Sequence, residues 1–289
     1  MNAIRVVAVQ PRSGMGDRER HHVDDVVDWI ERAADDGADL VVFPEGYPGP
    51  TNPANEFDAF TPLAEAAARR RVHVVASRIE PAGEGHHMTL QLIGDEGQTL
   101  GVYRRMVPRG PYVYHDIPAW EFDYVEASGD LPVFPTRLGT IGLQVCSEVY
   151  ASESSRVLAL KGADIIAYPA GGAINELLPS WRTMVWARAI ENLVFTVATQ
   201  NIYFDDEEGV ATIAAPEEVL AESAQPGLVV ADLDLDRLRF LRDEDERIEF
   251  PKRYRTMPGI WRWRRPELYG PLVERTEAPS EGSGGRRSR

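Results

Sequence analysis

The sequence predicts an α/β fold in which mixed sheets are covered by helices. Apolar runs rich in β-branched residues alternate with segments of helical periodicity. This rhythm occurs once before and once after a long stretch rich in aromatic residues, Gly and Pro. No internal segment has the composition of a linker, so we expect a single domain over residues 1–275. The remaining residues, 276–289, are typical of a disordered tail.

The first half of the chain predicts strands and helices in alternation. Apolar side chains recur at helical spacing from Val23 to Ala34, which indicates an amphipathic helix, and Gly37 is a residue type that commonly follows a helix. The sequence Asp95-Glu96-Gly97 separates two apolar runs and predicts the turn of a hairpin. The expected elements are a strand at 4–9, a helix at 21–36, a strand at 40–43, a helix at 62–71 and strands at 73–79, 88–93 and 99–103.

The second half repeats the pattern after the long aromatic stretch at 108–132. That stretch has no clear period and predicts a loop, and loops of this length inside a compact domain are usually functional. The expected elements after it are strands at 139–146 and 165–168, a helix at 180–191, strands at 194–199, 210–214 and 228–232, and a short helix at 235–241.

Composition limits the function classes. The net charge of −15 disfavours nucleic acid and anionic membranes as partners. The first residues lack the features of a secretory signal, no window approaches a membrane-spanning length, and a single cysteine allows no internal disulfide. We therefore expect a cytoplasmic protein. No cluster of Cys, His and Asp has the spacing of metal ligands, so we expect no metal and no other cofactor.

Cys146 is the first candidate for chemistry. It ends the apolar run GTIGLQVC, and the carboxyl ends of strands are where α/β proteins form their sites. A lone cysteine is often only a small buried hydrophobe, however, and a nucleophilic thiol needs a base. Of the six histidines only His115, in the long loop, is a candidate for that base. The alternative is Glu45, which follows the run LVVFP and could act as a base if burial raises its pKa.

Several segments resemble the carbon–nitrogen hydrolase (nitrilase-like) superfamily over roughly residues 4–273. GADLVVFPEGYPG at 37–49 is similar to the segment that carries the family's catalytic glutamate. IGLQVCSEVYASESSRVLALKGADIIAYPAG at 141–171 is similar to the nucleophile segment. WRTMVWARAIENLVFTVATQN at 181–201, the segments GVATIAAPEEVLAES and LVVADLDLDRLRFLR, and RRPELYG at 264–270 follow in the family's order.

The resemblance implies an α-β-β-α sandwich with a C-terminal extension at 251–275. It also implies that Cys146 is the nucleophile and Glu45 the general base. The family's third catalytic residue is a lysine, and Arg105 stands in its place in GVYRRMVPRG. Arginine keeps the positive charge but is planar, bulkier and a poor proton donor. Arg105 is therefore expected either to stabilise an oxyanion, to bind a substrate carboxylate, or to mark a site that has lost hydrolysis.

The family also has a second glutamate between the lysine and the nucleophile. Glu121 is our choice for it, with Glu126 as competitor because the register is one residue off, and a plain loop carboxylate is the alternative. Glu148 resembles the acidic residue that nitrilases carry two places after the nucleophile. A backbone N–H near Ser147 is expected to face the oxyanion. The aromatic residues that could line a substrate pocket or only pack are Tyr47, Tyr112, Tyr114, Trp120 and Trp181.

The implied function is cleavage of a non-peptide C–N bond in a small amide-like substrate through a Cys146 thioester. Amides rank first as substrates, ureido (carbamoyl) compounds second and nitriles third. Acyl transfer to an amine by the same site is an alternative, and so is a catalytically inactive relative that binds a ligand or partner protein. The family commonly dimerises through helices beside the nucleophile, which predicts a homodimer or a larger even-numbered assembly.

Overall fold

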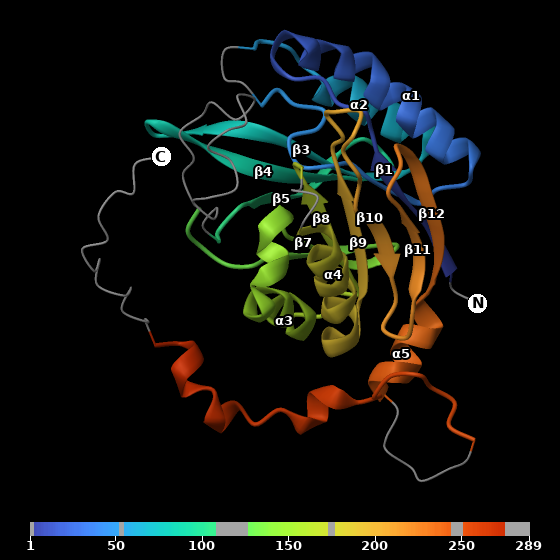
Figure 1. Ribbon diagram of the computed structural model, residues 1–289, viewed down its shortest axis with the longest axis vertical. Coiled ribbons are helices and arrows are strands. Elements are labelled where there is room, and N and C mark those ends of the chain that lie inside the picture. The colour runs from blue at the N-terminus through green and yellow to red at the C-terminus, as the bar shows by residue number, and fades with distance from the viewer. Residues whose placement is uncertain (1–2, 52–54, 108–126, 173–176, 244–250, 275–289) are drawn as a thin grey trace.

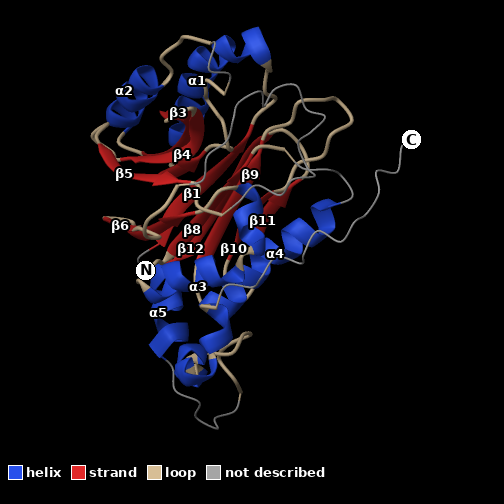
Figure 2. Ribbon diagram, turned by 90° about the vertical axis from the view of Figure 1, so that its left-hand side faces the viewer, coloured by secondary structure: helices blue, strands red, loops and turns tan. Residues whose placement is uncertain are grey.

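The computed structural model describes residues 3–51, 55–107, 127–172, 177–243 and 251–274, which form two six-stranded sheets flanked by helices (Figures 1 and 2). The first sheet has the order β12-β1-β2-β3-β4-β5 and the second the order β11-β10-β9-β8-β7-β6. Helices α1 and α2 cover the first sheet, and α3 and α4 lie on the opposite side of the molecule (Figure 2). The predicted α-β-β-α sandwich is confirmed.

The bounds of the elements follow the apolar runs closely. The strands of the first sheet are β1 (Ala3–Gln10), β2 (Leu40–Val42), β3 (His73–Ala82), β4 (Gly85–Ile93), β5 (Thr99–Arg104) and β12 (Gly227–Asp234). Those of the second are β6 (Val133–Thr136), β7 (Gly139–Leu143), β8 (Ile165–Ala170), β9 (Phe195–Gln200), β10 (Ala211–Ala214) and β11 (Val219–Ser223). The helices are α1 (His22–Asp35), α2 (Phe60–Arg70), α3 (Ser152–Leu160), α4 (Leu178–Asn192) and α5 (Leu235–Asp243).

Two strands and one α-helix of the described residues were not predicted from periodicity. Strands β6 and β11 are short edge strands whose side chains are mostly half-buried, so neither has a clean apolar alternation. β6 also contains Pro135, a residue that a sheet tolerates at its edge. Helix α3 buries only Ser155, Leu158 and Ala159, which is too few apolar positions for a clear helical pattern. Only the resemblance to the family implied a helix at this place.

The packing of the core explains why the strands of both sheets appear as apolar runs in the sequence. Helices α1 and α2 pack Ile30 and Leu63 against the outer face of the first sheet, where Val7 and Val41 lie. A second cluster fills the space between the sheets and extends to α3 and α4. Strands β1, β2 and β3 and strands β7, β8 and β9 are therefore buried on both faces, as parallel strands usually are.

Parallel pairing decides where the site forms. β2 runs parallel to its neighbours in the first sheet, and β7, β8 and β9 run parallel in the second. The two sheets meet at these carboxyl ends: the Glu45 N–H donates to the Ala170 carbonyl oxygen at 3.3 Å, and the Asn201 side-chain amide donates to the Glu45 carbonyl oxygen at 2.8 Å. Segments distant in sequence thus share one edge of the sandwich.

The described part of the C-terminal extension, 251–274, contains short 3-10 turns. It runs past α3 and α4 (Figure 1), and Tyr269, Leu272 and Val273 border a cavity of about 600 Å³ beside Arg156 and Val157 of α3. Across all of the described ranges, no helix has both the length and the apolar character needed to cross a bilayer.

Candidate active site

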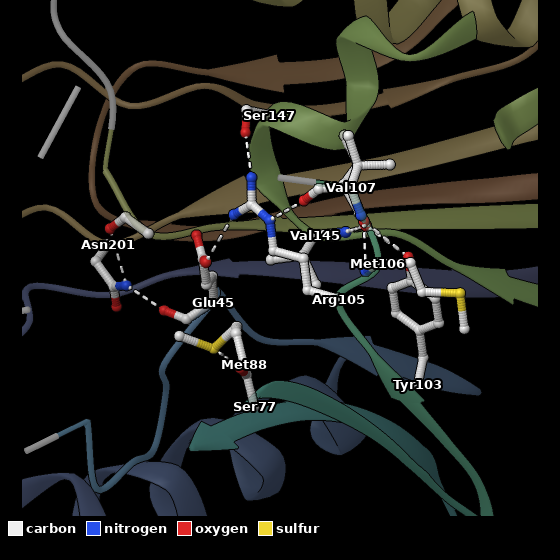
Figure 3. Close-up of polar contacts among 12 residues, drawn as sticks. Glu45, Ser77, Met88, Tyr103, Arg105, Met106, Val107, Val145, Ser147 and Asn201 are labelled. Carbon is white, nitrogen blue, oxygen red and sulfur yellow. Dashed lines mark hydrogen bonds and ion pairs between the residues drawn. The ribbon is translucent and has the colours of Figure 1, made fainter. Parts of the chain in front are cut away.

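Three buried side chains converge where the sheets meet: Glu45 after β2, Arg105 after β5 and Cys146 after β7. Figure 3 shows the Arg105 guanidinium extending between Glu45 and Ser147. All three residues are at least about nine-tenths buried, with relative exposures of 3%, 1% and 4%. The structure therefore brings together Glu45 and Cys146, which the sequence placed at distant strand ends, with Arg105, which the resemblance to the family supplied.

Glu45 is held rigidly by its backbone. The strand before it ends at Val42, and the two hydrogen bonds to Ala170 and Asn201 fix Glu45 against the second sheet. Asn201 also donates to the Gly171 carbonyl oxygen at 3.0 Å. Asn201 was not predicted from the sequence, although it lies directly after β9, where a site residue is expected.

The Glu45 carboxyl is adapted to accept and return a proton. Burial raises its pKa, while the positive charge of Arg105 and hydrogen bonds with the Cys146 side chain and the Gly171 backbone lower it, and the negative charge of Glu148 raises it further. The net direction is upward. A carboxylate with a raised pKa, beside a thiol, is the arrangement that general-base activation requires.

Cys146 does not end a strand, so this part of the sequence prediction is wrong. β7 stops at Leu143, and Cys146 is the first residue of a 3-10 turn that continues to Tyr150. Its φ of +47° is a left-handed conformation that side chains with a Cβ adopt at a cost of about 1–3 kcal/mol. The sharp turn separates the thiol from the sheet that precedes it.

Arg105 is anchored at three of its nitrogen atoms. Nη1 lies 3.4 Å from Oε1 of Glu45, Nη2 donates to the Ser147 hydroxyl, and Nε donates to the Val107 carbonyl oxygen at 3.1 Å (Figure 3). The main chain of Arg105 donates to the Met88 carbonyl oxygen at 2.9 Å. A fixed positive charge therefore sits between the candidate base and the turn that carries the thiol.

Glu148 is completely buried two residues after Cys146. Its carboxylate accepts hydrogen bonds from the Tyr103 hydroxyl at 2.8 and 2.9 Å and from the backbone N–H groups of Met106, Val107 and Val145 at 3.2, 3.0 and 2.6 Å. Both carboxylate oxygens of Glu148 therefore accept hydrogen bonds from protein groups, and its role in binding substrate stays a prediction.

The remaining predicted residues are placed as follows. Tyr47 packs on the α1 side, stacked on Phe43 at 5.4 Å and tilted against His22 at 4.5 Å between ring centroids, so it is not brought together with Cys146. Trp181 is buried on α4, in the same core cluster as Cys146. The residues that lie outside the described ranges are Tyr112, Tyr114, His115, Trp120, Glu121 and Glu126.

Tyr203, which was not predicted from the sequence either, follows β9 and is half-buried. Burial raises the pKa of its phenol, and the negative charge of Glu45 raises it further. Cys146 contributes in the same direction, which places the phenol within electrostatic reach of both. No pattern in the sequence singles out this tyrosine. Among the described residues, no group of three or more His, Cys, Asp and Glu side chains is arranged to hold a metal ion.

His22 supports the loop that follows Glu45 in its neutral form. Its Nε2 accepts from the Gly14 N–H at 2.9 Å, which leaves Nδ1 to donate to the Pro48 carbonyl oxygen at 3.3 Å. Burial lowers the His22 pKa to about 4. The His22 imidazole binds a proton near pH 6.5 in the unfolded chain but only near pH 4 in the folded chain. The free energy of unfolding therefore falls as the pH falls from 6.5 to about 4.

We expect the unfolding free energy of the wild type to drop by about 3 kcal/mol more than that of His22→Gln between pH 7 and pH 4. Urea titrations at a series of pH values measure the difference. The exposed neighbour His21 is the matched control: His21→Gln should keep the wild-type slope. Equal slopes for His22→Gln and the wild type would contradict the neutral, buried state of His22.

The sequence of this chain is similar to that of known proteins. Residues 5–243 match the family described as "Carbon-nitrogen hydrolase". The chain belongs to the carbon-nitrogen hydrolase family. It is 30% identical over 238 residues to a nitrilase of Pyrococcus abyssi, covering 75% of this chain and 84% of the relative.

Solved structures of the carbon-nitrogen hydrolase family share the fold. A carbon-nitrogen hydrolase from Helicobacter pylori superposes with a TM-score of 0.78 at 22% identity, covering 94% of this chain and 99% of that one. An amidase variant from Nesterenkonia sp. superposes with a TM-score of 0.69 at 25% identity, covering 83% and 93%. In that amidase, the acetamide moiety of fluoroacetamide is covalently added at the active-site cysteine. Family membership supports a hydrolase of small amide-like substrates.

Proposed function

We propose that this carbon-nitrogen hydrolase cleaves the C–N bond of a small amide through a thioester on Cys146. One observation carries the proposal: the Cys146 thiol interacts with the buried Glu45 carboxylate, and Arg105 links that carboxylate to Ser147, the residue after the nucleophile. A thiol, a base and a fixed positive charge are the three components that acyl transfer to a thiol requires. The covalent adduct at the active-site cysteine of the Nesterenkonia amidase supports the same role for Cys146.

The mechanism begins with proton transfer from Cys146 to Glu45. The thiolate attacks the carbonyl carbon, and the carbonyl π electrons move to oxygen, where Arg105 and the backbone N–H of Ser147 stabilise the negative charge. The tetrahedral intermediate collapses, the C–N bond breaks, and Glu45 returns its proton to the leaving nitrogen. Glu45 then removes a proton from water, whose oxygen attacks the thioester carbon. The C–S bond breaks, the acid departs, and Glu45 returns the proton to the Cys146 sulfur.

Arg105 is proposed as the oxyanion stabiliser rather than as the binder of a substrate carboxylate. A bidentate carboxylate contact uses either the two Nη atoms of the guanidinium or Nε together with one Nη atom. Nε of Arg105 already donates to the Val107 carbonyl oxygen. Here the Nη atoms are directed to Glu45 and Ser147, so a substrate carboxylate would have to displace one of these partners. The charge itself remains 3.4 Å from the base and beside the nucleophile turn, where charge develops in the reaction.

Amides are the first substrate class to test, ureido compounds the second and nitriles the third. We expect the purified chain to release ammonia from at least one member of a panel of small aliphatic amides, ureido acids and nitriles, measured by a coupled ammonia assay. The acid product, detected by mass spectrometry, separates hydrolysis from acyl transfer. An absence of turnover across the panel, together with a Cys146 thiol that iodoacetamide does not label, would favour an inactive binding protein.

We propose in addition that two copies associate through α3 and α4. Val157 and Leu160 of α3 are partly exposed apolar side chains, and Leu272 and Val273 of the extension are exposed beside them. Apolar side chains gathered on one face indicate an interface. The sedimentation coefficient of a monomer at micromolar protein would contradict this dimer.

A further inference from the structure

Glu148 lies at a junction between two segments that are distant in sequence. Three of its four donor residues, Tyr103, Met106 and Val107, belong to the segment that carries Arg105. The fourth, Val145, directly precedes Cys146 and donates the shortest of these bonds, at 2.6 Å. One carboxylate therefore ties the Arg105 segment to the nucleophile turn.

The same junction fixes the Arg105 side chain. Val107, whose N–H is bound by Glu148, accepts the hydrogen bond from Nε of Arg105 through its carbonyl oxygen. At the other end of the guanidinium, Nη2 donates to Ser147, which lies on the turn that Glu148 holds. An arginine side chain has many rotamers, and two of its three polar contacts here, with the Val107 carbonyl oxygen and the Ser147 hydroxyl, are made to the segments that Glu148 joins.

We propose that Glu148 is a positioning residue, which holds the Arg105 guanidinium at its distance from the Cys146 turn and makes no contact with substrate. Its carboxylate is fully buried and its hydrogen bonds come from the protein. The proposal rests on the proposed hydrolase function for its kinetic test, and on the chemistry of the thiol alone for a second test. A substrate-binding role for Glu148, which the sequence suggested, is the competing outcome.

Two substitutions of Glu148 distinguish the effect of its side-chain length from the effect of its negative charge. Glu148→Asp keeps the negative charge but shortens the side chain by one methylene, so it cannot reach both segments. Glu148→Gln keeps the length but replaces one acceptor oxygen with an NH₂ group, which would face a backbone N–H. The matched control is Glu217→Gln, because Glu217 is a largely buried carboxylate that accepts from the Arg237 guanidinium and the Arg255 N–H at 2.7 Å, outside the site.

In both Glu148 variants we expect kcat to fall about 100-fold, since a displacement of about 1 Å in a catalytic group costs that much. KM should change by less than about threefold, because the proposed role involves no contact with substrate. Glu217→Gln should lower the melting temperature and leave kcat unchanged. A rise in KM with kcat retained would overturn the proposal in favour of substrate binding.

The pH profile distinguishes positioning from a purely electrostatic effect. The titratable groups that shift the pKa of Glu45 are Arg105, Cys146 and Glu148, and the Tyr203 phenol, whose own pKa the Glu45 charge raises, lies nearby. If Glu148→Asp displaces Arg105, the pKa of Glu45 rises and the acid limb of kcat/KM moves to higher pH. A purely electrostatic role predicts an unchanged acid limb in Glu148→Asp and a lower one in Glu148→Gln, and that pair of results would overturn the proposal.

Alkylation of Cys146 tests the positioning role of Glu148 independently of the proposed hydrolase function. Cys146 is the single cysteine, so the rate of iodoacetamide labelling reports on this thiol alone, with or without turnover. If the wild type hydrolyses nothing but Glu148→Asp labels about tenfold more slowly than the wild type, the positioning role stands and the proposed function fails. If the wild type is active and Glu148→Asp matches it in kcat and labelling, the positioning role fails alone.

Tyr103→Phe is a second test of the positioning role, which can be used if the Glu148 variants do not fold. It removes the hydroxyl donor and leaves the three backbone donors in place. We expect a fall in kcat of a few-fold, with KM unchanged, because one of the four attachments is lost. If no Glu148 variant folds, and Tyr103→Phe has the kcat and the labelling rate of the wild type, the proposal is contradicted.

Discussion

Replacing Cys146 by alanine is expected to abolish turnover, with a loss of at least about 10³-fold in kcat. No other thiol exists in the chain, and a thioester cannot form without one. Alanine keeps the Cβ and therefore the same left-handed strain, so the unfolding free energy should change by only about 1 kcal/mol. Initial rates on the best amide of the panel measure the loss, and melting temperatures confirm the fold.

Two further variants make the Cys146 result specific. Cys146→Ser keeps the shape but carries a hydroxyl that a carboxylate deprotonates poorly, so it should be inactive as well. Ser155→Ala removes a buried hydroxyl that bonds to Gln144 and Tyr168 and has no proposed part in the reaction, so it should keep kcat. Full turnover in Cys146→Ala would refute the thioester mechanism.

Removal of the charge on Arg105 is expected to have the second-largest effect. Arg105→Met should lower kcat by about 10²–10³-fold, the usual cost of losing one oxyanion partner. The same change removes the attraction that lowers the pKa of Glu45, so that pKa rises. Because Glu45 must be ionised to act as base, the acid limb of kcat/KM should move to higher pH.

Arg105→Lys tests whether the guanidinium itself is required. An ammonium keeps the charge, but its single nitrogen cannot reach Glu45, Ser147 and the Val107 carbonyl together. We expect kcat between those of the wild type and Arg105→Met, about tenfold below the wild type. The exposed neighbour Arg104, which pairs with Glu80, is the control: Arg104→Lys should match the wild type. Higher activity in Arg105→Lys than in the wild type would instead indicate a site that has lost its original lysine and most of its hydrolysis.

The sequence by itself predicted an α/β fold with mixed sheets and two candidate catalytic residues, and the resemblance to the family implied the sandwich. The apolar runs at 40–43 and 139–146 predicted buried strands, and α/β proteins form their sites at the carboxyl ends of such strands. Glu45 and Cys146 could be named for that reason, before any distance was known. The resemblance to the family supplied Arg105, whose place in an edge-strand segment has no periodic signal.

Tertiary structure decided how these residues are held. The left-handed turn at Cys146, the attachment of Glu45 to Asn201 and the junction at Glu148 each depend on how two sheets are aligned. Periodicity in the sequence indicates which face of a helix or strand is buried. It does not indicate which backbone N–H groups of other segments will form hydrogen bonds with the side chains on that face. Tyr47 illustrates the limit: it lies two residues from Glu45, yet its ring packs toward α1 rather than toward Cys146, because side-chain direction is fixed by packing and not by distance along the chain.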